Sequence, residues 1–255
     1  MSQSYRGAET ITRAVDGERV TVHWWITTNT RISIQSAVVG NSGTNVSSWE
    51  AFRNVVNGSF FPGLDHHTLV NSFHVNSGVP VLSNPIPYDG SRNFEDITNQ
   101  SEPFEFIVDP LHKDRDGLVG FGTGGLFPVT TQNGRTLNLS TVRWGIGGMA
   151  LNMRDISFNN RDIFNSSWKW RALRSPTEVT RRTAIGYLGG TNISTFYVLA
   201  VFSECEVFDV RAWLQSKGVV SVALNLDGGG STQARGNGID VMTSSRLIPT
   251  RIVLQ

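Results

Sequence analysis

Hydrophobic and polar residues alternate one by one in several segments of this chain. The alternation is clearest in residues 19–27 and 31–39. A period of two is typical of strands with one buried face, and short apolar runs between turns are typical of strands buried on both faces. These patterns predict strands at residues 19–27, 31–39, 104–108, 118–121, 183–187 and 196–202.

Helical spacing of apolar residues occurs at two places. Residues 49–55 show it over barely two turns, and Val207 to Leu214 show it more clearly. The second segment ends at Lys217-Gly218, which is a typical C-terminal cap. A β-rich run at residues 219–226 follows and leads directly into a glycine-rich loop.

Strands outnumber helices in this pattern. We therefore expect an α+β fold, with a mixed, mostly antiparallel sheet, a few packed helices and a single domain. Residues 1–50 are expected to supply N-terminal strands that pack on a main domain formed by residues 51–255. Residues 62–140 are rich in proline and glycine and give few periodic signals.

Composition narrows the function classes. The chain has 255 residues, and its net charge of +1 offers no basic surplus for a nucleic acid duplex or an anionic membrane. Its single cysteine, Cys205, excludes an intramolecular disulfide and a metal site built from several cysteines. The first eleven residues lack the apolar core of a secretory signal, so we expect a cytoplasmic protein. Release by lysis or incorporation into a particle stays open.

The glycine-rich loop is the strongest candidate for chemistry. Asp227 ends the β-rich run, and Gly228, Gly229, Gly230, Ser231 and Thr232 follow it. Consecutive glycines let several N–H groups point into one concavity, which can hold an oxyanion, and the two hydroxyls add donors. A tight hairpin turn is the alternative explanation of the same residues.

Two further segments carry candidate ligand contacts. Asn57-Gly58 precedes a pair of phenylalanines, and the asparagine could bind a sugar hydroxyl or a phosphate oxygen. Arg181-Arg182 begins a buried strand, where an arginine can bind phosphate or carboxylate with two parallel hydrogen bonds. A structural turn and a pair of solvated charges are the respective alternatives.

Taken in order, these motifs resemble the phosphodiester glycosidase family. The resemblance rests on residues 57–61 (NGSFF), 147–151 (GGMAL), 182–186 (RTAIG) and 223–232 (ALNLDGGGST). The chain departs from the family pattern at Met149, where proline is usual, and at Gln233, where an apolar residue is usual. The resemblance implies hydrolysis of a bond between an anomeric carbon and a phosphate oxygen.

Family resemblance also implies roles for the motif residues. Asp227 would be the carboxylate that acts as nucleophile, base or electrostatic partner of the sugar, and Arg182 would bind the phosphate. The residues expected to contact substrate are Asn57, Gly58, Gly148, Gly228, Gly229, Gly230, Ser231 and Thr232. A second carboxylate would activate water. Asp209, Glu204 and Glu206 are the candidates, with Asp209 taken as the catalytic one, and a helix cap or a solvated charge is the alternative for Asp209.

Other chemistry-bearing residues give weaker signals. No cofactor is expected. A divalent cation stays open, at Asp65, His66, His67 and His74 or at Asp114 and Asp116. The tryptophans Trp24, Trp25, Trp144, Trp168 and Trp170 could stack on sugar rings, but we expect them to pack structurally.

Three functions remain at the level of sequence. The first is a hydrolase acting on a glycosyl phosphodiester, a teichoic-acid-like polymer or a nucleotide sugar. The second is a protein that sequesters a phosphate-bearing sugar or nucleotide without turnover. The third is a glycan-recognising component of a phage or envelope assembly, and a homo-oligomer is compatible with each.

Overall fold

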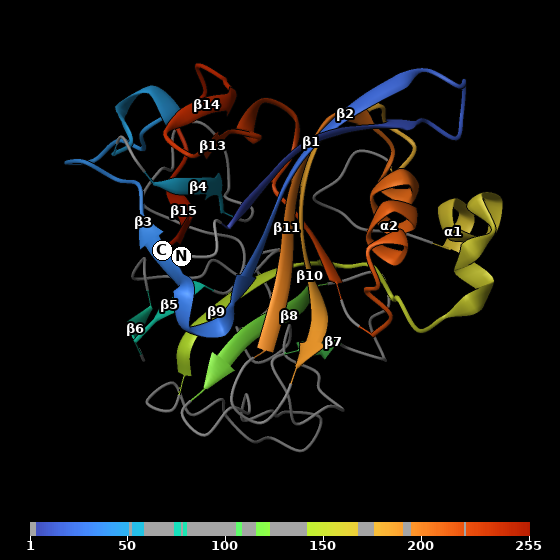
Figure 1. Ribbon diagram of the computed structural model, residues 1–255, viewed down its shortest axis with the longest axis horizontal. Helices are drawn as coiled ribbons and strands as arrows, with labels where there is room; N and C mark the ends of the chain where they lie inside the picture. Colours follow the sequence, from blue (N-terminus) through green and yellow to red (C-terminus); the bar gives the residue numbers. More distant parts are fainter. Residues whose placement is uncertain are drawn as a thin grey trace.

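The alternating segments form two antiparallel sheets in the computed structural model (Figure 1). Every strand pairing in the described part of the chain is antiparallel. The structure describes residues 4–50, 53–58, 74–77, 79–80, 106–108, 116–122, 142–167, 176–190, 195–221 and 223–255. Together with few helices, this confirms a mostly antiparallel, sheet-rich fold, richer in strands than a balanced α+β protein.

The larger sheet runs in the order β1-β2-β11-β10-β12-β9-β5-β6, and β8 joins it through β9 and carries β7. Its strands are β1 (Tyr5–Thr12), β2 (Arg19–Thr28), β5 (His74–Asn76), β6 (Val79–Pro80), β7 (Phe106–Val108), β8 (Asp116–Gly122), β9 (Val142–Ala150), β10 (Thr180–Gly190), β11 (Thr195–Cys205) and β12 (Ala223–Leu226). Strand β12 lies centrally, between β10 and β9, so the loop that follows it leaves the middle of the sheet.

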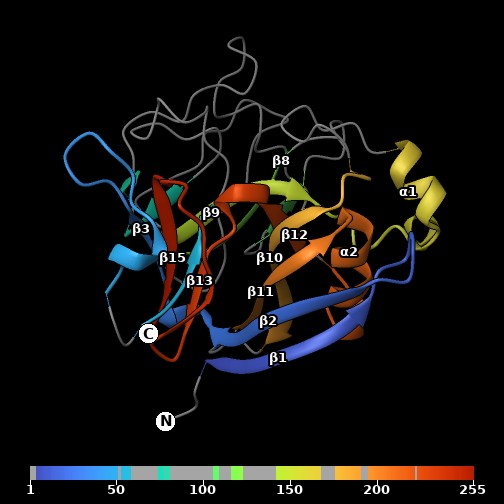
Figure 2. The same cartoon turned by 90° about the horizontal axis from the view of Figure 1, so that it is seen from above.

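The smaller sheet runs in the order β14-β13-β4-β15-β3. Its strands are β3 (Ile32–Ser36), β4 (Asn54–Asn57), β13 (Ala234–Gly236), β14 (Ile239–Met242) and β15 (Thr250–Leu254). The first 50 residues therefore supply strands to both sheets, because β1 and β2 lie in the larger one and β3 in the smaller one. Figure 2 shows the two sheets from above.

Two helices and four short 3₁₀ turns complete the described elements. They are α1 (Arg161–Ser167), α2 (Val207–Ser216), η1 (Asn29–Arg31), η2 (Val46–Ser48), η5 (Ile156–Asn159) and η6 (Gly229–Ser231). No helix in the described ranges is both long and apolar enough to cross a membrane.

The hydrophobic core has two large clusters, one on each face of the larger sheet, and a smaller third cluster formed by Val46, Trp49, Val55, Ile248 and Val253. Strand β11 shows the division: Leu199 and Val201 face the smaller sheet, whereas Ala200 and Phe202 face α2. The alternation occurs because successive side chains of a strand point to opposite faces. The result is three layers, with the smaller sheet, the larger sheet and α2 in that order (Figures 1 and 2).

Most predicted elements are confirmed, with changes at their ends. The strands predicted at residues 19–27, 183–187 and 196–202 correspond to β2, β10 and β11, and α2 coincides with the predicted second helix. Strands β3, β7 and β8 correspond to the predictions at residues 31–39, 104–108 and 118–121.

The helix expected at residues 49–55 is wrong. Residues 54–57 form strand β4, which pairs with β13 and β15. Val55 and Val56 are both buried. Val55 and Val56 are β-branched and are buried on opposite faces of the smaller sheet. Such a pair favours a strand that is covered on both faces over a short helix. The β-rich run at residues 219–226 is also shorter than expected, because β12 begins only at Ala223.

The described tryptophans pack structurally. Trp25 and Trp144 are fully buried, and their ring N–H groups donate to Asn54 Oδ1 at 3.1 Å and to the Asn29 carbonyl at 2.8 Å. Trp24 packs edge-on against Trp213, with 5.9 Å between ring centroids. Trp168 and Trp170 lie outside the described residues.

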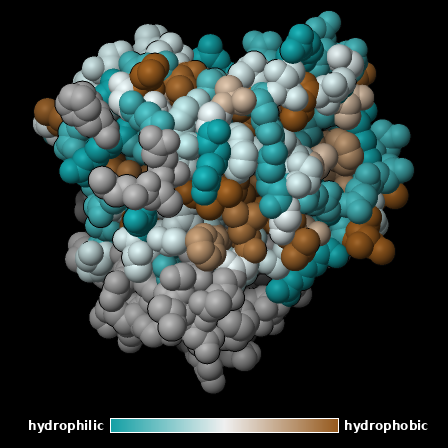
Figure 3. All heavy atoms as spheres, viewed as in Figure 1, coloured by the Kyte–Doolittle hydropathy of each residue, from teal (hydrophilic) through white to brown (hydrophobic). Residues whose placement is uncertain are grey.

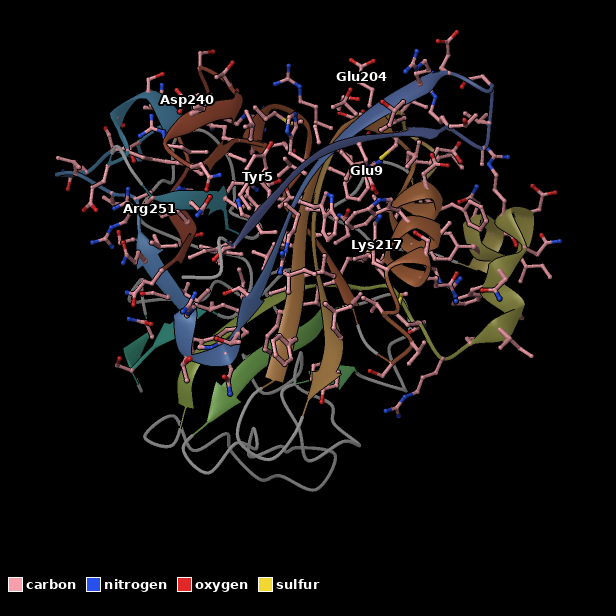
Figure 4. All side chains as sticks on the ribbon, in the orientation of Figure 1. Tyr5, Glu9, Glu204, Lys217, Asp240 and Arg251 are labelled. Atoms are coloured by element: carbon pink, nitrogen blue, oxygen red, sulfur yellow. The ribbon has the colours of Figure 1, made fainter. Side chains whose placement is uncertain are left out.

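A cluster of charged and aromatic residues joins β1 to α2. Lys217 lies above the rings of Trp24 and Trp213, and its Nζ is 2.7 Å from Glu9 Oε2. Figure 4 shows Glu9 and Lys217 in the gap between strand and helix, and Figure 3 shows hydrophilic residues around a hydrophobic patch on this face of the molecule. Because Lys217 forms both an ion pair with Glu9 and cation–π contacts with the two rings, the cluster links the edge strand β1 to α2.

Candidate functional site

The glycine-rich loop begins where β12 ends, and two of its glycines are required sterically. A Cβ on Gly228 would stand 2.7 Å from the Arg181 carbonyl oxygen, so a side chain would separate the loop from β10. Gly229 has φ +57°, in the left-handed region that favours glycine. The loop then turns through η6, closed by hydrogen bonds from the Ser231 and Thr232 amides to the Gly228 and Gly229 carbonyls.

Asp227 is the central titratable group of this loop. Its side chain is partly buried, and Oδ1 accepts a hydrogen bond of 2.9 Å from the Gly228 amide. Burial raises the pKa of Asp227 to about 6, while the hydrogen bond with Ser231, the charge of Arg246 and the Gly228 amide oppose that rise. The carboxylate therefore exchanges a proton close to neutral pH, which suits a group that takes part in acid–base chemistry.

Arg182 lies beside this loop. Thr183 of β10 pairs with Leu226 of β12, so the same antiparallel register carried one residue further sets Arg182 opposite Asp227. The close approach of Gly228 to the Arg181 carbonyl shows that the two segments stay adjacent there. The backbones of the two residues are thus neighbours, but neither side chain is among the charges that shift the pKa of the other.

The guanidinium of Arg182 is buried and incompletely paired. Its Nε donates to the Cys205 carbonyl at 3.4 Å and Nη2 to the Glu178 carbonyl at 2.5 Å, whereas Nη1 finds no partner in the described residues. Burial lowers its pKa. No carboxylate among the described residues forms a salt bridge with it. A buried cation with an unused donor is costly unless a ligand pairs with it.

Asn57 has a structural role in addition to the sugar contact predicted for it, which stays a prediction. Its Nδ2 donates to the Asp227 carbonyl at 2.9 Å and to the Gly58 carbonyl at 3.0 Å. Its Oδ1 accepts from the Thr183 hydroxyl at 2.7 Å and from the Gln233 amide at 3.2 Å. Both donors and both acceptor sites of the buried amide are used. Asn57 therefore holds the two ends of the glycine-rich loop in place, through the Asp227 carbonyl and the Gln233 amide.

Replacing Asn57 by alanine is expected to lower the free energy of unfolding by about 2–4 kcal/mol, because it leaves several buried groups without partners. Urea unfolding followed by tryptophan fluorescence measures the loss. Asn41→Ala, at an exposed loop position, is the matched control and should change stability by less than about 0.5 kcal/mol. Unchanged stability with weaker substrate binding would instead support a sugar contact.

Gly58 and Gly148 are close-packing positions in the fold. A Cβ on Gly58 would collide with the side chain of Thr250, and the Gly58 amide donates to the Thr250 carbonyl at 2.9 Å. A Cβ on Gly148 in β9 would stand 2.8 Å from the Asn225 carbonyl of β12. Both glycines hold neighbouring strands near the loop, and neither offers a side chain to a ligand.

The predicted amide cradle is smaller than the sequence suggested. The Gly228 amide binds the Asp227 carboxylate, and the Ser231 and Thr232 amides close the turn. The Thr232 hydroxyl is buried 3.5 Å from that of Thr183. Within the described chain, the amides of Gly229 and Gly230 donate to no acceptor, so these two remain to meet an anion.

Asp209 caps a helix and lies apart from this loop. Its Oδ1 accepts from the Ala14 amide at 2.8 Å and its Oδ2 from the Glu206 amide at 3.0 Å, which completes the capping box of α2. Burial raises its pKa. With both oxygens held by backbone donors, Asp209 links the β1–β2 hairpin to α2, and its catalytic role stays a prediction.

Neither alternative second carboxylate is among the charges that shift the pKa of Asp227. Both carboxylate oxygens of the buried Glu206 bind Arg161, at 2.6 and 2.7 Å. Glu204 is exposed near the β1–β2 hairpin (Figure 4). Among the described residues, Arg246 is the charged group that shifts the pKa of Asp227.

Arg246 is a site residue that the sequence analysis missed. Its Nη1 lies 3.3 Å from the Ser231 hydroxyl, and its Nε lies 3.2 Å from the position of a Cβ on Gly230. It comes from the segment between β14 and β15, outside every motif considered above. Arg246 comes beside the loop because the chain passes back through β14 and β15 of the smaller sheet. No local sequence pattern predicts this proximity.

Most residues considered for a cation lie outside the described part of the chain, so the cation sites stay predictions. No group of three or more metal-binding side chains occurs among the described residues. Asp65, His66, His67 and Asp114 lie outside them. His74 lies in β5 and Asp116 in β8.

Comparison with known proteins supports the architecture. The catalytic domain of zebrafish N-acetylglucosamine-1-phosphodiester α-N-acetylglucosaminidase, in a form autoinhibited by its pro-peptide, superposes with a TM-score of 0.62 at 15% identity. The match covers 100% of this chain and 84% of that chain. The likeness is one of fold.

Two other solved structures match less closely. They are a hypothetical protein from Synechocystis, at 12% identity and a TM-score of 0.42, and a putative exported protein from Burkholderia pseudomallei, at 11% and 0.32. The matches cover 97% and 99% of this chain and 62% and 58% of those chains, respectively. No protein-family model matches the sequence, and no curated protein matches it.

Proposed function

We propose that this protein is a hydrolase that cleaves the glycosidic C1–O bond of a sugar phosphodiester. One observation carries the proposal: Asp227, with a pKa of about 6, follows β12 at the start of the glycine-rich loop, and the buried, incompletely paired Arg182 of the neighbouring strand β10 approaches the same loop at Gly228. The distant fold likeness to a phosphodiester glycosidase and the order of the four sequence motifs support it.

The chemistry of the bond assigns a task to each group. When the C1–O bond breaks, its electron pair leaves with the phosphate oxygen and positive charge develops at C1. The Asp227 carboxylate stabilises that charge, attacks C1 directly, or takes the proton of the water that attacks C1. Arg182 binds the phosphate as it gains charge. Water supplies the new C1 hydroxyl, and the products are a reducing sugar and a phosphate monoester.

The rate is expected to depend on pH through Asp227. A nucleophile, base or electrostatic partner must be ionised, so kcat/KM should rise about tenfold per unit as pH increases toward 6 and level off above it. A pH–rate profile on a glycosyl phosphodiester measures this. A rate that instead falls above pH 6 would mean that the protonated form acts, contrary to the proposed role.

A second function is favoured by one observation: among the carboxylates expected to assist Asp227, Asp209 is held by backbone amides, Glu206 is paired with Arg161, and Glu204 is exposed. A site with a single carboxylate and an unpaired arginine suits a protein that binds a phosphate-bearing sugar or nucleotide without turnover.

Phosphorus NMR separates the two functions. Purified protein is incubated with a glycosyl phosphodiester, a teichoic acid fragment, UDP-N-acetylglucosamine and, as control, a cyclic dinucleotide. A new phosphomonoester signal that Asp227→Asn abolishes supports the hydrolase. Line broadening without product supports the binding protein, and no change in any sample contradicts both.

A further inference from the structure

Arg246 presents a free cation at the edge of the glycine-rich loop. Its side chain is exposed, its Nη1 approaches the Ser231 hydroxyl at 3.3 Å, and its Nε borders Gly230. Arg246 forms no salt bridge within the described part of the chain. The guanidinium thus keeps donors available while it stands beside Asp227.

The backbone under this side chain is fixed. The Arg246 carbonyl accepts a hydrogen bond of 2.7 Å from Nε2 of Gln233, and its amide donates to the Ser244 hydroxyl at 3.1 Å. Gln233 is fully buried, and its Oε1 accepts from the Val46 amide at 2.8 Å. The buried Gln233 therefore holds the backbone at Arg246 in place. This lowers the conformational entropy lost when the Arg246 side chain binds a ligand.

We propose that Arg246 binds the phosphate of the substrate and makes the site selective for an anionic leaving group. This inference rests on the proposed function and deepens it. The planar guanidinium pairs with two phosphate oxygens, while the Ser231 hydroxyl keeps its hydrogen bond to Asp227. Arg246 meets the phosphate from the solvent side, and the fully buried Arg182, whose Cδ lies 3.7 Å from the position of a Cβ on Gly228, supplies a second positive charge behind the loop.

The charge of Arg246 also links ligand binding to the titration of Asp227. Arg246 lowers the pKa of Asp227 in the free protein. A phosphate bound to the guanidinium cancels part of that positive field, so the pKa of Asp227 should rise when phosphate binds. Truncation of Arg246 should abolish the phosphate-dependent part of this shift.

Kinetics with two leaving groups test the selectivity. Arg246→Ala should raise KM for a glycosyl phosphodiester about 10- to 100-fold and leave KM for the corresponding neutral aryl glycoside within about twofold. Arg246→Lys, which keeps the charge without the planar fork, should recover part of the loss. Arg19→Ala removes an equal charge at an exposed position of β2 and should change neither value. Equal effects on both substrates would overturn the proposal.

A steric variant tests the same contact without removing the charge. A Cβ at residue 230 would press on Nε of Arg246 at 3.2 Å, so Gly230→Ala should displace the guanidinium and raise KM for the phosphodiester less than Arg246→Ala does. Circular dichroism confirms that each variant folds. A Gly230→Ala effect on the neutral glycoside as large as that on the phosphodiester would speak against a phosphate contact.

Binding of inorganic phosphate keeps this test independent of turnover. Calorimetry should show phosphate binding at least tenfold weaker to Arg246→Ala than to the unmodified protein. Carbon NMR of Asp227 should show its pKa raised by phosphate only when Arg246 is present. If the unmodified protein hydrolyses neither substrate but binds phosphate through Arg246, the proposed hydrolase fails and the anion contact stands. Phosphate binding that is absent or unaffected by the variant overturns the contact.

Discussion

Asp227→Asn is expected to lower kcat/KM on a glycosyl phosphodiester by about 10³-fold, because it removes the negative charge that the positive transition state needs. Asparagine keeps an oxygen that can accept the Gly228 amide, so the loop should retain its shape. Asp162→Asn, whose side chain is 91% exposed on α1, is the matched control and should leave the rate unchanged. A fall of less than tenfold for Asp227→Asn would remove Asp227 from the mechanism.

The same variant should gain stability at neutral pH. Folding raises the pKa of Asp227 from its usual value to about 6, so the folded protein binds the proton more tightly than the unfolded chain. The free energy of unfolding therefore declines as pH rises from about 4 through 6. The Asp227→Asn variant lacks this decline, because asparagine does not ionise. Thermal unfolding should give Asp227→Asn a higher Tm than the unmodified protein at pH 7 and no such advantage at pH 4. A variant that is less stable than the unmodified protein at pH 7 would contradict this.

Arg211→Met is expected to lower the free energy of unfolding by about 3–5 kcal/mol. Arg211 lies in α2 and is fully buried. Its guanidinium donates to the carbonyls of Leu151, Asn152, Met153, Asp155 and Phe158 and to the Asn159 side chain. Methionine keeps the apolar part of the side chain but has no hydrogen-bond donor. The decrease in the free energy of unfolding therefore measures the cost of leaving these carbonyls without partners.

Urea unfolding measures the Arg211 effect against Gln215→Ala. Gln215 lies one turn along the same helix and bonds the same Asn159 side chain from an exposed position. That variant should cost less than about 1 kcal/mol. Similar losses for the two variants would show that the arginine does not organise residues 151–159.

Local patterns predicted the regular part of the fold because their physical causes are local. Alternation in β2 and β11 reflects a buried face, and α2 follows its apolar spacing. The helix expected at residues 49–55 was wrong because the partners of β4 determine its structure: Val55 and Val56 pair with β13 and β15, which lie about 180 and about 200 residues away in sequence.

The candidate site was predictable only in part. Asp227 and the glycines that follow it stand out in the sequence, because a carboxylate after a β-rich run and three consecutive glycines are local features. The role of Asn57 was not visible, because its hydrogen bonds reach residues 183, 227 and 233. Arg246 was missed for the same reason: its partners become its neighbours only in the folded chain.

Isotope tracing tests the central claim, cleavage at C1–O, most directly. The protein hydrolyses a glycosyl phosphodiester in water enriched in ¹⁸O, and the products are examined by phosphorus NMR and mass spectrometry. The account predicts that the label enters the sugar and that the phosphate monoester carries none. Label in the phosphate would show that the P–O bond is cleaved and would contradict the proposed hydrolysis at the anomeric carbon.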